Sequence, residues 1–219
     1  MKGKALATGQ ITITAPQFEV LKLKLVGTAP FVQHKFSQKA KRMMLEAQTN
    51  GNVSKNKKKE PRNIQEDYEQ ATYRTALGEY GIPAAAFRCA MISACRLAGL
   101  VMTKAKLSVF VEADDYDVED GTALVILDGE PELHQSAVRL ESGVASIAVR
   151  PMWRKWSVNL RIRYDAGQYD VESIVNLLKY AGMCVGVGEG RPDSKKSTGM
   201  GWGLFAIDET AEFEITEAV

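Results

Sequence analysis

The segment WSVNLRIRY, residues 156–164, alternates apolar and polar side chains and constrains the fold more than any other stretch of the chain. Successive side chains of an extended chain point to opposite faces, so the alternation separates the two kinds. The apolar face carries Trp156, Val158, Leu160, Ile162 and Tyr164, and the polar face carries Ser157, Asn159, Arg161 and Arg163. The pattern predicts a strand with one buried face and one open face.

Other segments alternate between strand and helix patterns. Residues 18–26 alternate leucine with lysine, whereas residues 83–98 and 170–181 repeat apolar side chains at the helical period. Asp170 is expected to cap the second of these helices and Gly182 to end it. Weaker strand patterns lie at 106–111, 122–127, 145–151 and 202–207, and weaker helix patterns at 37–48 and 64–77.

The clearest elements suggest a specific fold. In chain order they are strand 18–26, helix 83–98, strand 122–127, strand 156–164, helix 170–181 and strand 202–207. This βαββαβ order is that of ferredoxin-like and RRM-like folds, so we expect an α+β protein with such a core. We expect residues 1–219 to form a single domain. Residues 27–82 are a long basic insertion after the first strand, and a glycine-rich loop precedes the last strand.

The glycine-rich loop GVGEGRPDSKKSTGMGWGLF, residues 186–205, carries six glycines together with Arg191, Lys195 and Lys196. Glycine lacks a Cβ, adopts positive φ and lets the main chain approach a ligand closely. A P-loop or a Rossmann fingerprint leads from a strand into a helix, whereas this loop leads from a helix into a strand. We therefore expect a cradle for the phosphates of a nucleic acid and not a P-loop ATPase.

Charged residues are sorted along the chain, although the net charge is only +1. Lys35 to Arg62 holds nine basic residues and two acids, and Arg150 to Arg163 holds five basic residues and no acid. Glu112 to Asp120 holds six acids and no base. Concentrated positive charge is an electrostatic footprint for phosphate, although the lysines at 55–59 are equally consistent with a solvated loop.

Aromatic and basic residues alternate in the segment WRKW, residues 153–156. Aromatic rings stack on bases and arginines bind phosphates, a combination typical of surfaces for single strands. Trp156 continues the apolar alternation of its strand, which favours a place in the core. Arg154, Arg161 and Arg163 are interpreted as nucleic-acid contacts.

Catalytic and metal-binding patterns are sparse. Neither His34 nor His134 lies at metal-ligand spacing from a cysteine, so we expect no metal and no cofactor. His34, beside Lys35, suits an acid or base for RNA cleavage, but a polar histidine at a strand-to-helix junction is the favoured interpretation. The acidic run DDYDVEDG lacks the glutamate that an EF-hand needs at position twelve, and we interpret it as a surface loop.

The sequence also indicates a compartment. It contains no stretch of 18 apolar residues and no secretion signal, so we expect no membrane contact. Cys89, Cys95 and Cys184 form no CxxC pair and cannot all be paired within one chain, which favours a reducing environment. We expect a cytoplasmic protein of a bacterium or a phage-infected host.

The element order and the loop together resemble a known superfamily. The glycines that carry the resemblance are Gly186, Gly188, Gly190, Gly199, Gly201 and Gly203, before WGLFAI. In this arrangement the chain is similar to the repeat-associated mysterious protein (RAMP) superfamily, which supplies backbone and RNA-processing subunits of CRISPR complexes. LVGTAPFVQHKFS, residues 25–37, is similar to the segment after the first strand of backbone subunits. The whole, including NLLKYAGMCVGVGEGRP, also resembles an uncharacterised family of bacteriophage proteins.

These observations predict a non-enzymatic protein that binds single-stranded RNA or DNA. The resemblance implies a nucleic-acid-contacting insertion, a homo-oligomer along the strand, and CRISPR or recombination proteins as partners. Two alternatives stay open: an endoribonuclease that uses His34, and a phage protein that imitates or inhibits a CRISPR complex or anneals strands. The expected nucleic-acid-binding residues are Lys35, Lys39, Arg42, Lys57, Lys58, Lys59, Arg154, Lys155, Arg161, Arg163, Gly188, Gly190, Arg191, Lys195, Lys196 and Gly201.

Overall fold

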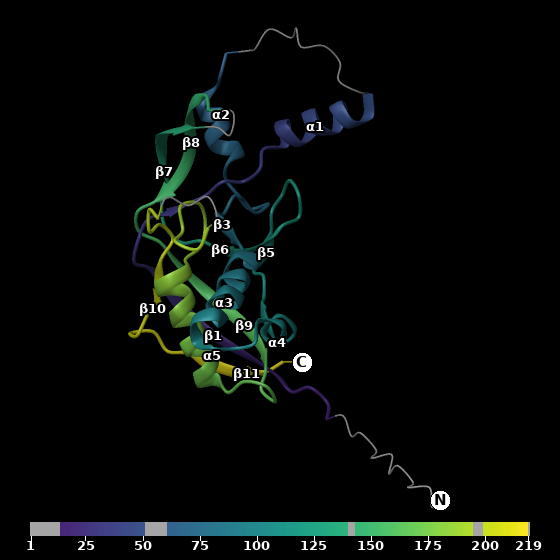
Figure 1. The fold of residues 1–219 in the computed structure, drawn as a ribbon, viewed down its shortest axis with the longest axis vertical. Helices are drawn as coiled ribbons and strands as arrows, with labels where there is room; N and C mark the ends of the chain where they lie inside the picture. Colours follow the sequence, from purple (N-terminus) through teal and green to yellow (C-terminus); the bar gives the residue numbers. More distant parts are fainter. Residues whose placement is uncertain (1–13, 51–60, 140–142, 195–198, 219) are drawn as a thin grey trace, which may run out of the picture.

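Strands β1 (Phe18–Gly27) and β9 (Ser157–Asp165) pair antiparallel along nearly their whole length and form the centre of the largest sheet, sheet A (Figure 1). The computed structural model describes residues 14–50, 61–139, 143–194 and 199–218 of this α+β protein. The order of strands in sheet A is β10 (Phe205–Ile207), β1, β9, β4 (Val109–Val111), and β11 (Glu214–Glu217) also pairs with β1. Every neighbouring pair is antiparallel.

One face of sheet A is buried beneath helices α3 (Ala84–Ala98) and α5 (Val171–Tyr180), which lie side by side on it (Figure 1). The alternation predicted for β1 and β9 is confirmed, because Leu21, Leu23 and Leu25 and the apolar residues of β9 belong to one buried cluster. Trp156 lies in that cluster, as the alternation indicated. The polar positions of both strands form the opposite face, which we call the open face.

The predicted end of α3 and the predicted start of α5 are both confirmed. Gly99 ends α3 in the left-handed conformation (φ 68°), and the Asp170 side chain accepts a hydrogen bond from Ser173 N at 2.7 Å at the start of α5. The prediction that Gly182 ends the second helix is wrong. The chain continues as a π-helical turn, η1 (Ala181–Val185), and leaves it at Gly186 with φ 74°.

The prediction that residues 122–127 supply the second strand of the core is also wrong. β6 (Ala123–Ile126) pairs instead with β3 (Gly81–Pro83) and β5 (Asp115–Tyr116) in a separate sheet. The strand beside β9 is β4, which directly follows helix α4 (Met102–Ser108). Periodicity identifies a strand but not its partner, and the three residues of β4 are too few to show a period.

The third sheet joins the insertion to the second half of the chain. β2 (Phe31–Val32) pairs with β8 (Ala145–Trp153), which pairs with β7 (Glu132–Arg139). Helix α2 (Ile64–Gln70) packs on β8, and helix α1 (Gln38–Asn50) projects away from the sheets (Figure 1). Within the described residues, no helix has the length and apolar character needed to cross a membrane.

Candidate functional site

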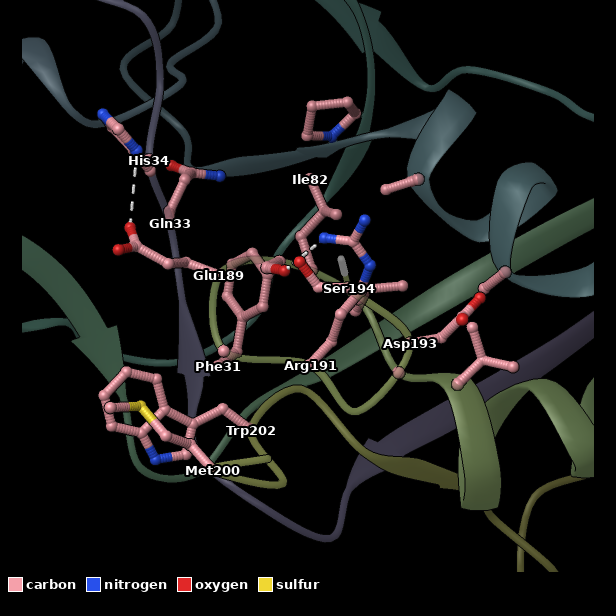
Figure 2. A pocket seen from close by; sticks show the side chains of 18 of the residues that line it. Phe31, Gln33, His34, Ile82, Glu189, Arg191, Asp193, Ser194, Met200 and Trp202 are labelled. Atoms are coloured by element: carbon pink, nitrogen blue, oxygen red, sulfur yellow. Dashed lines mark hydrogen bonds and ion pairs between the residues drawn. The ribbon is translucent and has the colours of Figure 1, made fainter. Parts of the chain in front are cut away.

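A cleft of about 1060 Å³ lies between the glycine-rich loop, the first half of α3, strand β7 and the segment that follows β1 (Figure 2). Its volume is at the upper end of the range for small-molecule pockets. The wall on α3 is built from small side chains, namely Ala85, Ala86, Cys89, Ala90 and Ser93. Pro83, the N-cap residue of α3, gives the first turn no side-chain hydrogen bond, so its leading N–H groups lack a cap at the edge of the cleft.

Main-chain hydrogen bonds hold the glycine-rich loop against the segment after β1. Glu189 N donates to Val32 O at 2.9 Å, and Gly203 N donates to Pro30 O at 2.7 Å. The two arms of the loop also bond to each other, from Val187 N to Gly203 O at 3.0 Å. These hydrogen bonds fix the position of the loop, which forms one wall of the cleft.

The glycines of the loop are needed by the protein's own packing. Gly188 has φ +80°, and a Cβ there would lie 2.6 Å from both the Phe31 ring and Val32 O. Gly190 has φ +77°, and its Cβ would lie 2.5 Å from the Trp202 ring. At these two positions the absence of a Cβ makes room for neighbouring protein atoms and not, as we expected, for a phosphate. Gly201 differs, because its φ is +70° and no described atom lies within 4 Å of a Cβ added there.

Among the described residues of the loop, Arg191 is the cationic side chain that lines the cleft. In Figure 2 its guanidinium extends from the loop toward Ile82. Nη1 donates a hydrogen bond to Gly188 O at 2.9 Å, and among the described residues Arg191 makes no ion pair. The charge of Arg191 also helps to lower the pKa of Asp193, and its remaining N–H groups are donors for a ligand.

An ion pair holds the loop to α3 at the far side of the cleft. Arg96 Nη2 lies 2.7 Å from Asp193 Oδ2, and Ser93 Oγ donates to the same carboxylate. Hydrogen bonds from Ser93 and Arg96 lower the pKa of Asp193, so the pair is intact at neutral pH.

A second charged cluster lies at the mouth of the cleft. Glu189 Oε2 lies 3.5 Å from His34 Nδ1 (Figure 2). The same oxygen lies 2.6 Å from Arg150 Nε. Arg150 Nη2 lies 3.2 Å from the same imidazole nitrogen. Burial and the neighbouring charge of Arg150 lower the pKa of His34, against the opposing effect of Glu189. His34 is therefore neutral at neutral pH while half of its side chain stays exposed.

Lys35, which we expected to contact phosphate, is not available to a ligand. Its side chain is 2% exposed, and Nζ lies 2.8 Å from Asp117 Oδ2 and 2.6 Å from Glu119 Oε2. Burial alone would lower the pKa of Lys35, but hydrogen bonds to the two carboxylates raise it. The prediction that Lys35 contacts nucleic acid is therefore wrong, because its charge is neutralised by Asp117 and Glu119.

The basic residues of the second stretch also lie outside the cleft. Arg154 pairs with Glu132 at 2.6 Å in the β8–β9 turn, where Lys155 is exposed. Arg161 Nη2 lies 3.2 Å from Asp114 Oδ1 on the open face of sheet A. Arg163, on the same face, stacks between the rings of Phe18 and Phe110.

The remaining expected residues lie on the insertion or outside the described part of the chain. Lys39 and Arg42 are exposed on α1. Lys57, Lys58, Lys59, Lys195 and Lys196 lie outside the described residues. The cleft therefore combines Gly188, Gly190 and Arg191 from the expected set, with Gly201 in the same loop.

Three residues of the site were missed from the sequence: Arg150, Glu189 and Trp202. Arg150 is the first residue of a basic stretch, but only the β7–β8 register places it opposite His134 and near the cleft. The ring of Trp202 contacts His134 edge-on, with centroids 5.5 Å apart. The sequence signal for Trp202 was its position between two glycines of the loop.

No known protein-family model matches the chain, and no curated protein sequence matches it at a significant level. Among the described residues, no group of three or more His, Cys, Asp or Glu side chains is arranged to hold a metal ion. The geometry of the cleft is the basis for a proposal of function.

Proposed function

We propose that this chain is a non-enzymatic protein that binds single-stranded nucleic acid in the cleft beside its glycine-rich loop. The elements β1, α3, β4, β9, α5 and β10 follow the βαββαβ order, and their strand order β10-β1-β9-β4 supports a ferredoxin-like core. The glycine-rich loop between α5 and β10 supports the resemblance to the RAMP superfamily. Three free cysteines, Cys89, Cys95 and Cys184, support a reducing cytosol as the compartment.

The orientation of Arg191 carries this proposal. Its guanidinium lies in the cleft without an ion pair to any described residue, and beyond its effect on Asp193 its free donors suit a bound anion. The uncapped first turn of α3 borders the same cleft and favours negative charge.

The lining of the cleft favours a nucleic-acid strand over a compact anion. The side chains of Tyr73 and Trp202 line it and offer rings for base stacking. The small residues of α3 leave room for a chain that is longer than a single phosphate group. Base stacking with phosphate contacts is the mode by which proteins bind single strands without sequence preference.

The test measures the affinity of Arg191→Gln for labelled oligothymidylate and oligouridylate by fluorescence anisotropy. A charged hydrogen bond contributes about 1.5–3 kcal/mol, so we expect a loss of about tenfold or more. The slope of log K against log salt should become shallower by about 0.7, the value for one phosphate contact on a single strand. Comparison of the two probes tells RNA from DNA.

The matched control is Arg154→Gln, which removes the same charge outside the cleft. It should leave both the affinity and the salt slope within about twofold of wild type, because Arg154 pairs with Glu132 at the surface, where such a pair contributes little. If both variants lose affinity equally, binding is a diffuse effect of net charge and the cleft is not the site.

We also propose that copies of the chain assemble along the strand. The exposed side chains of Met43, Met44 and Leu45 on the projecting helix α1 support contact with another protein. Size-exclusion chromatography before and after nuclease treatment tests this assembly. A large species that absorbs as nucleic acid and collapses to the monomer on treatment is expected, and a monomer in both runs contradicts it.

A further inference from the structure

The open face of sheet A carries a cationic row that crosses its two central strands. The row consists of Lys22 and Lys24 on β1 and Arg161 and Arg163 on β9, and Lys22 lies directly opposite Arg161. Like charges at directly opposite positions of a sheet repel each other. Counter-charges must therefore come from outside these two strands.

The C-terminal acidic segment, residues 208–217, supplies those charges for both lysines. It contains five acids and no base: Asp208, Glu209, Glu212, Glu214 and Glu217. Glu214 is the register partner of Lys22, and its Oε2 lies 2.9 Å from Lys22 Nζ. Asp208 N donates to Lys24 O at 2.9 Å, and Asp208 Oδ2 lies 4.0 Å from Lys24 Nζ. The segment thus places carboxylates along one edge of the row.

Strand β11, the end of this segment, is held by little buried surface. Phe213 is 65% exposed and Ile215 is 42% exposed. The side chains of Lys22 and Glu214 are 44% and 60% exposed, and an exposed ion pair contributes at most about 1 kcal/mol. β11 covers only the first half of the edge of β1, since β10 pairs with Leu25–Gly27. The order β10-β1-β9-β4 does not depend on β11.

We propose that the acidic segment is an autoinhibitory strand. In the free protein its carboxylates pair with Lys22 and Lys24, while Arg161 pairs with Asp114. A nucleic-acid strand displaces the acidic segment, so that the two lysines and Arg163 of the open face become a second binding surface. The phosphates take the place of Glu214 and Asp208. At the end of the row Phe18 and Phe110 flank Arg163 at 5.1 and 4.9 Å and hold its guanidinium on this face. The inference rests on the proposed function only in taking single-stranded nucleic acid as the ligand.

The test uses the full chain with Glu214→Gln, the β11 variant, which removes the carboxylate opposite Lys22 and keeps the shape of the strand. The matched control, Glu172→Gln, removes one carboxylate elsewhere on the molecule. Relative to that control, the β11 variant should bind labelled oligothymidylate about fivefold more tightly, the equivalent of one exposed ion pair. The salt slope should steepen by about 0.7 for each additional phosphate that the protein neutralises.

Two further measurements make the outcome decisive. Adding Lys22→Gln to the β11 variant should abolish the increase in affinity, and in wild type hydrogen exchange at residues 214–217 should quicken when the probe binds. An increase no larger than the control's, an increase that survives Lys22→Gln, or unchanged exchange would overturn the proposal. The Arg191→Gln variant tests binding in the cleft alone, so the proposed cleft site and the autoinhibitory strand can be refuted separately. If neither wild type nor the β11 variant binds, both are wrong.

Discussion

Lys35 Nζ lies 2.8 Å from Asp117 Oδ2, and both side chains are buried beside the start of helix α1. The Asp117 carboxylate also accepts hydrogen bonds from the backbone N–H of Arg74 and of Glu119, each at 3.1 Å. This buried pair therefore joins the start of α1, the segment after α2 and the acidic loop. The acidic run that resembled an EF-hand serves to neutralise a lysine.

Replacing Lys35 with methionine should destabilise the protein. The Asp117 carboxylate would stay buried without its partner, which costs about 3–5 kcal/mol of unfolding free energy. Urea denaturation followed by circular dichroism measures this loss. Lys41→Met is the control, since Lys41 and Asp120 form a more exposed pair worth no more than about 1 kcal/mol. A Lys35→Met protein of wild-type stability but weakened binding would restore Lys35 as a phosphate contact.

The pH dependence of Lys35 has a definite sign. Its pKa in the folded protein lies above the ordinary lysine value of 10.5, so folding favours the protonated form. The stabilisation is complete below pH 10.5 and disappears as the pH rises through the raised pKa. Wild type should thus lose more stability than Lys35→Met when denaturation is repeated at increasing alkaline pH. Parallel losses in the two proteins would contradict the pairing.

His34 should make binding pH-dependent without making the protein a nuclease. Its pKa is lowered in the free protein, where burial and Arg150 outweigh Glu189, and a phosphate at the cleft mouth would raise it. Affinity should therefore increase as the pH falls from about 7.5 toward 5.5, and His34→Gln should flatten this profile. Labelled RNA should stay intact throughout. Specific products that disappear in His34→Ala would favour the endoribonuclease.

The sequence predicted those features that depend on local periodicity. The alternation at 156–164 and the cap at Asp170 were interpreted correctly because each rests on neighbouring side chains. The partner of each strand was not predictable, since β4 and β6 both precede β9 and their pairing is a long-range choice. The burial of Lys35 was not predictable either. The segment from Phe31 to Lys35 does not alternate, since Phe31, Val32, Gln33 and Lys35 are all buried and His34 is exposed. The inward turn of Lys35 depends on Asp117, which is distant in sequence.

Trp202 offers an intrinsic reporter of the cleft. Trp153 and Trp156 are buried, whereas Trp202 is partly exposed and lines the cleft. Stacking of a base on its ring should quench tryptophan fluorescence when oligothymidylate is added, and Trp202→Phe should remove that quenching. Trp202→Ala should weaken binding by about 1–3 kcal/mol per stacked base. Quenching that persists in Trp202→Phe would place the ligand elsewhere.

Alanine substitutions at Gly188 and Gly201 separate glycines that the packing of the loop requires from glycines that it does not. Gly188→Ala combines positive φ with a Cβ placed 2.6 Å from Val32 O, so either the loop or β2 must shift. Gly201→Ala meets open space and should cost only the left-handed backbone, about 1–2 kcal/mol. Thermal melting should therefore show a clearly larger loss for Gly188→Ala. Its binding should fall as well, because the displaced loop carries Arg191, whereas Gly201→Ala should bind as wild type does. If Gly201→Ala abolishes binding while its melting temperature barely changes, the ligand contacts the loop at Gly201, and the phosphate cradle extends beyond Arg191.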